Sequence, residues 1–331
     1  MRTKKIMFTN NKWGVWKTTL TYNIWKKLAS LWYKVVLVDL DHQCNLSVLS
    51  LWEEFLENNL FSWENIYSVL ENLVKWVWDI NEKVNFIDID KNLSILQWNI
   101  SLSLYEWILW NAFNEASSGL ERWFVVTSAI NRFLDKKWLD ENIDFFLIDT
   151  NPSLSLLNKS IFLWTDYFVV PTMSDIFNFQ WIENLWNFFE NEKRNWNITA
   201  KVLAKDKKIT SDLILDWESL FLWYIVNSYN VYAKQPIKSH KNWIEKIPKQ
   251  VKEFLSYKHC KNWLVDLSWD KPLWFTQDYG QLSSLSHQKQ KAIFEFGKKD
   301  IHDKWTLELL EKAKVEIDIV VSELIERVEK W

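Results

Sequence analysis

Short apolar runs alternate with longer amphipathic segments along most of this chain. The runs lack the strict alternation of a half-exposed strand, which is typical of strands buried on both faces of a parallel sheet. We therefore expect strands at residues 5–9, 35–39, 84–89, 93–97, 145–149, 167–171 and 222–226.

Helical spacing separates most of these runs, as at Leu20, Ile24 and Leu28. The expected helices span residues 17–31, 65–75, 102–116, 120–136, 153–163 and 178–193. Strands that alternate with helices of this length predict an α/β fold, with a doubly wound, mostly parallel sheet flanked by helices.

The regular alternation ends before the chain does. We interpret residues 1–300 as one domain, in which 197–220, with its clustered charges, is an insertion or extended loop. The segment 283–297 has helical spacing. Residues 301–331 form a C-terminal helical extension, with 302–330 expected as one long helix.

Charge and cysteine content exclude several classes of protein. The net charge of −3 excludes a globally basic nucleic-acid binder, although a local basic patch remains compatible with it. No run of 18 apolar residues and no signal-peptide core is present, so we expect a cytoplasmic protein without a membrane span. Cys44 and Cys260 form no CxxC pair, which favours incidental thiols over a disulfide, zinc or iron–sulfur site.

The chain has 4 Gly and 25 Trp. Roughly 7% Gly is usual, which would be about 23 residues here, so the glycine deficit is close to the tryptophan excess. Several tryptophans stand where a fold needs a residue without a Cβ. Trp32, Trp138 and Trp164 lie between a helical segment and a following strand, where helix caps favour glycine.

We hypothesise that one codon, written here as Trp, is read as Gly in the organism that makes the protein. The alternative is a protein that is truly rich in tryptophan.

Residues Lys12-Trp13-Gly14-Val15-Trp16-Lys17-Thr18-Thr19 lie between an expected strand and an expected helix. In this context a phosphate loop directs consecutive backbone N–H groups at a phosphate, and glycine permits the close approach. Lys17 is placed to reach the β- and γ-phosphates of a nucleotide, and the Thr18 hydroxyl to ligate Mg²⁺. With glycine at 13 and 16, the segment resembles the deviant Walker A motif of the ParA/MinD family, and especially its chromosome-partitioning ParA members.

This resemblance implies roles for further residues. The motif, Lys12 to Thr19, would bind ATP, and Lys12 would reach across a dimer interface to the partner's nucleotide; the alternative is a solvated loop lysine. Asp39-Leu40-Asp41-His42-Gln43-Cys44-Asn45 is similar to the family's Asp-Pro-Gln-Gly-Asn block, with His42 for Pro and Cys44 for Gly. Asp41 would orient the attacking water and Asp39 would support the Mg²⁺ shell, unless Asp39 only caps the next helix.

Two later strands extend the resemblance. Residues 145–149 are an apolar strand ending in Asp149, the Walker B pattern, which implies that Asp149 holds the Mg²⁺ water shell. The family usually has Pro where Asn151 stands. Residues 222–227 resemble its Gly-x-x-x-Asn strand, so Asn227 is the candidate for adenine contact, or else a strand-end cap. Residues 169–172 and 179–182 resemble the Val-Pro strand and the glycine that opens the next helix. The resemblance is strongest over 4–47 and 140–190 and does not cover the tail.

Eight lysines against two glutamates lie between residues 234 and 261. Such an excess binds phosphate backbones without reading sequence, and ParA relatives bind DNA through this part of the chain. A solvated helix is the alternative. The DNA-binding candidates are Lys234, Lys238, Lys241, Lys246, Lys249 and Lys252.

Three functions remain open. The first is a ParA-like partitioning ATPase that uses ATP and Mg²⁺, dimerises, binds DNA in the nucleoid and is reset by a ParB-like partner. The second is a MinD-like membrane-positioning ATPase, which the seven acidic residues between 308 and 329 disfavour because anionic lipid would repel them. The third is a scaffold unable to bind nucleotide, because Trp16 as written would occupy the phosphate position. Iron–sulfur relatives are disfavoured for want of cysteines.

Overall fold

The computed structural model describes residues 2–10, 15–58, 64–77, 79–115, 120–173, 176–199, 209–210, 213–217, 219–229, 231–232, 235–236, 246–249, 251, 275–277 and 279–330.

The described residues build a mostly parallel sheet of eight strands in the order β10-β7-β6-β1-β5-β2-β4-β3. Every neighbouring pair is parallel except β3 and β4, which are antiparallel. In chain order the strands are β1 (Lys4–Phe8), β2 (Val35–Leu40), β3 (Ile87–Asp90), β4 (Leu93–Leu96), β5 (Phe145–Thr150), β6 (Tyr167–Met173), β7 (Leu220–Tyr229) and β10 (Phe275–Gln277). The predicted fold class is confirmed.

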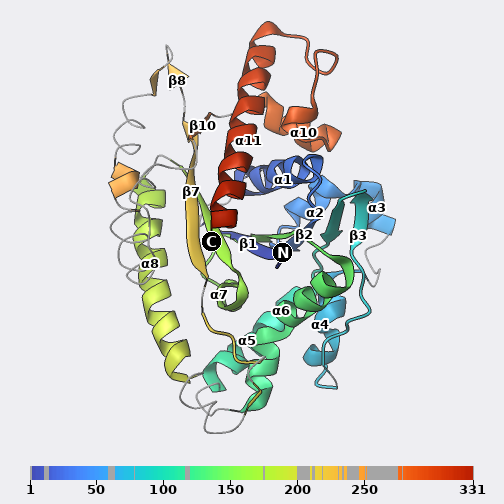
Figure 1. Cartoon of the computed structure of the whole chain (residues 1–331), viewed down its shortest axis with the longest axis vertical. Helices are drawn as coiled ribbons and strands as arrows, with labels where there is room; N and C mark the ends of the chain where they lie inside the picture. The colour runs from blue at the N-terminus through green and yellow to red at the C-terminus, as the bar shows by residue number, and fades with distance from the viewer. Residues whose placement is uncertain are drawn as a thin grey trace.

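Helices cover both faces of this sheet (Figure 1). One face carries α1 (Val15–Ser30), α10 (Gln281–Lys289) and α11 (Lys304–Lys330). The other carries α4 (Ile66–Val74), α5 (Leu102–Glu115), α6 (Glu121–Glu141) and α7 (Leu156–Trp164). The remaining elements are α2 (Asn45–Ser50), α3 (Glu53–Asn58), α8 (Ile176–Asn197), the 3₁₀ turn η5 (Ile293–Glu295), and the hairpin of β8 (Val231–Tyr232) with β9 (Gln235–Pro236).

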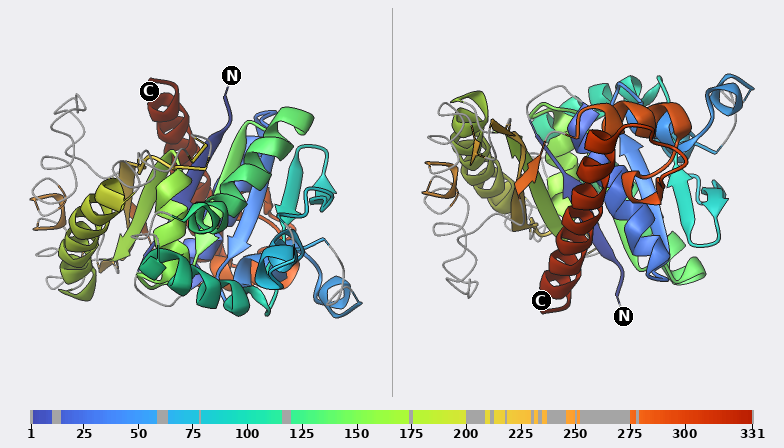
Figure 2. Two further views of the ribbon diagram at one scale, coloured as in Figure 1. Left: turned by 90° about the horizontal axis from the view of Figure 1, so that it is seen from below. Right: turned by 90° about the horizontal axis from the view of Figure 1, so that it is seen from above.

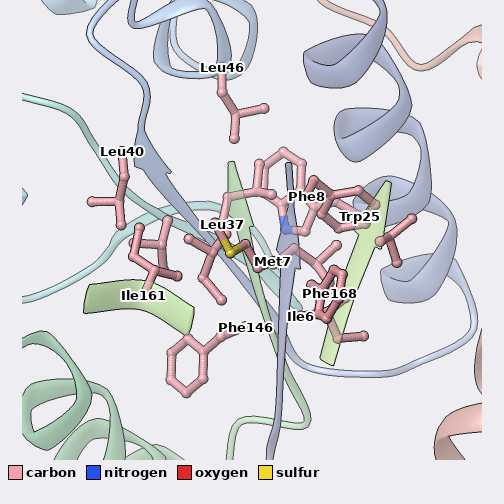
Figure 3. Packing of buried hydrophobic residues seen from close by; sticks show 14 of the residues in the cluster. Ile6, Met7, Phe8, Trp25, Leu37, Leu40, Leu46, Phe146, Ile161 and Phe168 are labelled. Carbon is pink, nitrogen blue, oxygen red and sulfur yellow. The ribbon is translucent and has the colours of Figure 1, made fainter. Parts of the chain in front are cut away.

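The core lies where the central strands meet the helices (Figure 3). Met7 of β1, Leu37 of β2 and Phe146 of β5 are fully buried, as the unbroken apolar runs predict. Each such side chain contributes roughly 1.5–3 kcal/mol through burial. Trp25 of α1 packs on this cluster and donates its indole N–H to the carbonyl of Val35 at 3.2 Å. This packing fixes α1 against the sheet, and with it the phosphate-loop end of the helix.

The C-terminal segments differ from the sequence prediction in one respect. The expected helix 283–297 ends early: α10 stops at Lys289, Gln290 takes the left-handed conformation with φ 48°, and a 3₁₀ turn follows at η5.

Part of the segment 197–220 lies outside the described residues. In its described part, Leu213 and Trp217 are buried in the core.

The long C-terminal helix packs on the domain instead of projecting from it. Helix α11 lies across α1 and also contacts η5 and β10 (Figure 2, right). Lys27 of α1 pairs with Asp318 at 2.5 Å. The apolar stripe of α11 is buried by these contacts; it comprises Leu309, Leu310, Ala313, Ile317, Val320, Val321, Leu324 and Val328.

Two tryptophans hold backbone conformations that favour glycine. Trp32 follows α1 with φ 72°, as predicted, and Trp76 follows α4 with φ 59°. A left-handed conformation is unfavourable for an L-residue with a Cβ.

At three other positions where glycine was expected, the backbone is not left-handed. Trp138 lies inside α6, whose left-handed cap is Asn142. Trp164 ends α7 before an extended Thr165. Trp181 lies within α8, which begins at Ile176 rather than near residue 181. Their backbones are not the left-handed ones that would require glycine.

Buried indoles give separate support to the glycine hypothesis. Trp25 and Trp196 donate hydrogen bonds to backbone carbonyls. A buried indole N–H ordinarily finds such an acceptor, but a larger group of buried indoles has none: Trp98, Trp123, Trp164, Trp181 and Trp217. In addition, the Arg327 guanidinium carbon lies only 2.6 Å from the centre of the Trp223 ring. This crowding is what bulky residues at natural glycine positions would produce.

Candidate functional site

The site lies where three adjacent parallel strands end. Strands β1, β5 and β2 are neighbours, so their carboxyl ends meet at one edge of the sheet. Helix α1 begins at this edge with Val15, within the phosphate-loop motif. Lys12, Trp13 and Gly14 lie outside the described residues, and Val15 and Trp16 are described only as the first helical backbone of α1.

Asp149, at the end of β5, contacts the side chains of Lys17 and Thr18 from the phosphate-loop motif. Its Oδ1 lies 2.5 Å from Lys17 Nζ, and its Oδ2 accepts a hydrogen bond from Thr18 Oγ1 at 2.9 Å. Lys17 also donates to the carbonyl of Thr150 and lies 3.4 Å from Asp41 Oδ2. All these groups are buried. The structure thus brings the predicted Lys17, Thr18, Asp41 and Asp149 into one cluster.

Asp39 lies beside this cluster and is held by a helix that the sequence analysis did not include. Its Oδ2 accepts hydrogen bonds from the Ser47 backbone N–H at 2.8 Å and from Ser47 Oγ at 2.7 Å. Ser47 Oγ in turn accepts a hydrogen bond from the backbone N–H of Trp98 at 3.1 Å. Asp39 therefore makes the helix-capping contacts of the alternative interpretation while standing opposite Asp149 in the sheet.

Burial dominates the electrostatics of the carboxylates. It raises the pKa of Asp39 to about 7, and the charge of Asp149 adds to this effect. Burial also raises the pKa of Asp149, although Lys17 opposes the shift. Lys17 contacts Asp41 and Asp149, and Asp39 stands opposite Asp149, so a bound cation would relieve the repulsion among these carboxylates.

The residues fit a magnesium ion bound in the manner usual for nucleotide sites. Within the described part of the chain, no three His, Cys, Asp or Glu side chains form a metal cage. Mg²⁺ is commonly held by one or two carboxylates together with phosphate oxygens. Thr18 Oγ1 and the Asp149 and Asp39 carboxylates supply hard oxygen donors of this kind.

The turn after β2 takes the shape that the family's glycine implies. Cys44, which stands where the resemblance has Gly, has φ 44° and precedes α2. Burial raises the pKa of its thiol to about 11, and the charges of Asp39 and Asp41 add to this effect. The two residues that replace proline also meet: His42 Nε2 lies 3.4 Å from Asn151 Nδ2.

The other predicted site residues lie apart from this cluster or are not described. Asn227 is in β7 opposite Met173 of β6 and Thr276 of β10, with its side chain outside the described atoms. Lys246 and Lys249 are exposed on a helical turn that buries Ile247. The remaining DNA-binding candidates fall outside the described residues: Lys234, Lys238, Lys241 and Lys252.

Sequence reasoning missed two residues at this site. Ser47 supports Asp39, and its only signal is a hydroxyl in the first turn of a helix after an acidic strand end. His287 of α10 places its Nε2 3.2 Å from Thr19 Oγ1. No local signal indicates His287, because the two residues are 268 positions apart.

A buried lysine and threonine at a helix N-terminus, bound to a strand-end aspartate, define the P-loop class of nucleotide-binding proteins. The family model described as an AAA domain (AAA_31) matches residues 3–202, more than half of the chain. The chain belongs to this family and is a P-loop protein of the ParA/MinD ATPase type.

Two curated relatives are similar to part of the chain. Protein MJECL24 of Methanocaldococcus jannaschii is 30% identical over 201 residues, which cover 60% of this chain and 70% of that protein. The virulence plasmid ParA family protein pGP5-D of Chlamydia psittaci is 25% identical over 206 residues, covering 61% and 69%.

Three solved structures share the fold. Protein DIP2308 of Corynebacterium diphtheriae has a TM-score of 0.65 at 22% identity, covering 77% of this chain and 89% of that one. A Borrelia burgdorferi plasmid partition protein bound to AMPPNP has a TM-score of 0.55 at 18% identity, covering 99% of each chain. Cobyrinic acid a,c-diamide synthase of Mycobacterium smegmatis, with an ATP analogue and magnesium, has a TM-score of 0.53 at 18% identity and covers 75% and 82%.

Proposed function

We propose that this protein is an ATP-dependent, dimerising ParA-like ATPase that partitions a chromosome or plasmid. In this proposal the ATP-bound dimer binds DNA non-specifically in the nucleoid, within the cytoplasm. A ParB-like partner stimulates hydrolysis of ATP to ADP and phosphate, which resets the cycle. The AMPPNP and magnesium complexes of the fold neighbours and the ParA relative support it.

One observation carries the proposal: Asp149 contacts both Lys17 and Thr18 at the carboxyl edge of the sheet. A buried cluster of this composition is expensive in a purely structural role, because each desolvated charge costs several kcal/mol that pairing only partly repays. The cost is explained if the lysine binds the phosphate chain of a nucleotide, and if the hydroxyl and the carboxylate bind its cation.

Each residue then has a defined task. Lys17 turns from Asp149 toward the β- and γ-phosphates and neutralises charge that develops during transfer. Asp41 orients the water for in-line attack, and Lys12 reaches the nucleotide of the other protomer. Thr18, Asp149 and Asp39 would hold Mg²⁺, which would neutralise charge on the phosphates. Asn227 contacts adenine.

The membrane-positioning alternative requires an amphipathic helix with a free apolar face. Helix α11 is the only described long helix after the sheet, and its apolar stripe is buried against α1, η5 and β10. No helix among the described residues is both long and apolar enough to cross a bilayer. These observations support the partitioning proposal over the MinD-like one.

The scaffold alternative depends on the tryptophans at positions 13 and 16. An indole next to Lys17 would exclude phosphate, whereas glycine at both positions permits the close backbone approach of a phosphate loop.

A comparison of two forms of the full chain tests the proposal. We would measure ATPase activity and salt-dependent DNA retention for the chain as written and for a chain with its family-aligned tryptophans changed to glycine. The proposal expects both activities only in the glycine form, with DNA retention that requires ATP and weakens as salt rises. Absence of both in the glycine form would contradict it, and equal activity in both forms would overturn the glycine hypothesis.

A further inference from the structure

A polar stripe on α1 is bound by a chain segment almost at the other end of the sequence. Thr19, Tyr22, Asn23 and Lys26 have helical spacing i, i+3, i+4 and i+7 and so share one face of α1. Residues 287–295, which we call the clamp segment, contact all four. The clamp segment runs from the last turn of α10 through η5.

Each of the four residues of this stripe makes a polar contact with the clamp segment. His287 Nε2 lies 3.2 Å from Thr19 Oγ1, and Tyr22 donates its hydroxyl proton to the Gln290 carbonyl at 2.8 Å. Ile293 N–H donates to Asn23 Oδ1 at 2.7 Å. Lys26 Nζ lies 3.9 Å from Glu295 Oε1. The clamp segment is therefore registered on α1, and His287 is the member at the phosphate-loop end.

A second anchor holds the clamp segment without touching the phosphate loop. Gln290 Nε2 lies 2.8 Å from each of the Val48 and Leu51 carbonyls, at the C-terminal end of α2. The left-handed backbone at Gln290 turns the chain so that this side chain reaches α2 while His287 reaches Thr19. Gln290 therefore attaches the clamp segment to α2, whereas His287 contacts the phosphate-loop motif at Thr19.

We propose that His287 is a nucleotide-positioning residue that couples phosphate binding to docking of the clamp segment. The inference rests on the proposed function, because it requires ATP at this loop. Thr19 follows Thr18 on α1, next to the first turn, whose backbone N–H groups can bind anions. The imidazole fixes the hydroxyl of Thr19, a residue that is 1% exposed, for the phosphate chain. Nucleotide that engages Thr19 in turn stabilises the clamp segment on α1.

The chemistry of His287 suits this task. Its side chain is half-buried, and burial lowers its pKa below the usual value, which favours the neutral ring. A neutral imidazole has one donor and one acceptor nitrogen, so Nε2 can pair with a hydroxyl in either direction. Glutamine preserves such a polar contact, whereas alanine removes it.

The test uses the full chain with glycine at positions 13 and 16 as parent, and AMPPNP with Mg²⁺ as the ligand. We would measure the Kd of the parent, of His287→Ala, of His287→Gln and of the matched control Gln290→Ala. Loss of one polar contact to a bound phosphate site predicts about tenfold weaker binding for His287→Ala. His287→Gln should retain most of the affinity. Gln290→Ala leaves the His287 contact in place, so it should lower the unfolding midpoint and weaken binding less than His287→Ala does.

Hydrogen exchange at the Ile293 amide gives a second readout. AMPPNP should slow its exchange in the parent but not in His287→Ala. Unchanged affinity in His287→Ala, or equal weakening in Gln290→Ala, overturns the inference while leaving the proposed function intact. A parent that does not bind AMPPNP overturns both.

Discussion

Asp39 and Asp149 stand directly opposite each other on the parallel strands β2 and β5, and both are completely buried. Two carboxyl groups in this position repel each other when both are ionised, and burial adds to the cost. The pKa of Asp39 is raised to about 7 and that of Asp149 is raised as well. This pair makes the stability of the protein depend on pH and on bound cations.

Stability of the nucleotide-free protein should fall as pH rises from 5 to 8. The pKa of Asp39 is near 3.8 in the unfolded chain and about 7 when folded, so the folded state binds the proton more tightly. The contribution of this group is full below pH 4 and is lost as pH rises through 7, at up to about 1.4 kcal/mol per pH unit. Chemical denaturation at several pH values measures this slope. Asp39→Asn should flatten it; an unchanged slope would contradict the prediction.

Asp149→Asn should abolish magnesium-dependent hydrolysis more severely than it affects folding. The variant loses the carboxylate that binds Lys17 and Thr18, and activity in the glycine form should fall on the order of 100-fold or more. Asp135→Asn is a matched control, because Asp135 pairs with the buried Lys5 at 2.5 Å away from the site. The control should lose stability but keep its turnover number. Similar losses of turnover in both variants would argue against a catalytic role for Asp149.

Trp32→Gly should stabilise the protein, although it removes a large side chain. Trp32 is 75% exposed and has φ 72°, so glycine relieves strain of about 1 kcal/mol at little loss of burial. Trp107 is the control, since it is 64% exposed within α5, and Trp107→Gly should destabilise by about 1 kcal/mol. Unfolding free energies of the two variants decide the matter, and a change of the same sign in both would refute this explanation.

Mass spectrometry of peptides from the natural host should find glycine at position 16. The glycine hypothesis also predicts glycine at Trp32 and Trp76, where the backbone is left-handed. The peptide that contains position 16 is the most informative, because this residue adjoins Lys17 in the phosphate loop. Tryptophan at position 16 in the natural protein would end the hypothesis.

The alternation of apolar runs predicted the sheet because parallel strands are buried on both faces and connected by helices. Lys17, Thr18, Asp41 and Asp149 lie together in the structure because the carboxyl ends of adjacent parallel strands share one edge of the sheet. Their places in the predicted strands and helix therefore indicated one site. The three-residue β10 has too little pattern to detect. The early end of α10 at Lys289 was also missed, because the apolar spacing continues while the backbone turns at Gln290.

Contacts over long sequence distances account for the rest. Ser47 contacts Asp39 across a turn in which Cys44 takes a left-handed conformation, which is uncommon for a residue with a Cβ. His287 meets Thr19 through tertiary packing of α10 on α1. Trp138 was misplaced because α6 continues to Glu141 and Asn142 supplies the cap that glycine was expected to supply.

Calorimetric titration of AMPPNP with Mg²⁺ into the full chain tests the central claim most directly. We predict binding to the form with glycine at positions 13 and 16, loss of that binding on Lys17→Ala, and no binding to the chain as written. A glycine form that does not bind AMPPNP, or whose binding survives Lys17→Ala, would contradict the assignment of this site.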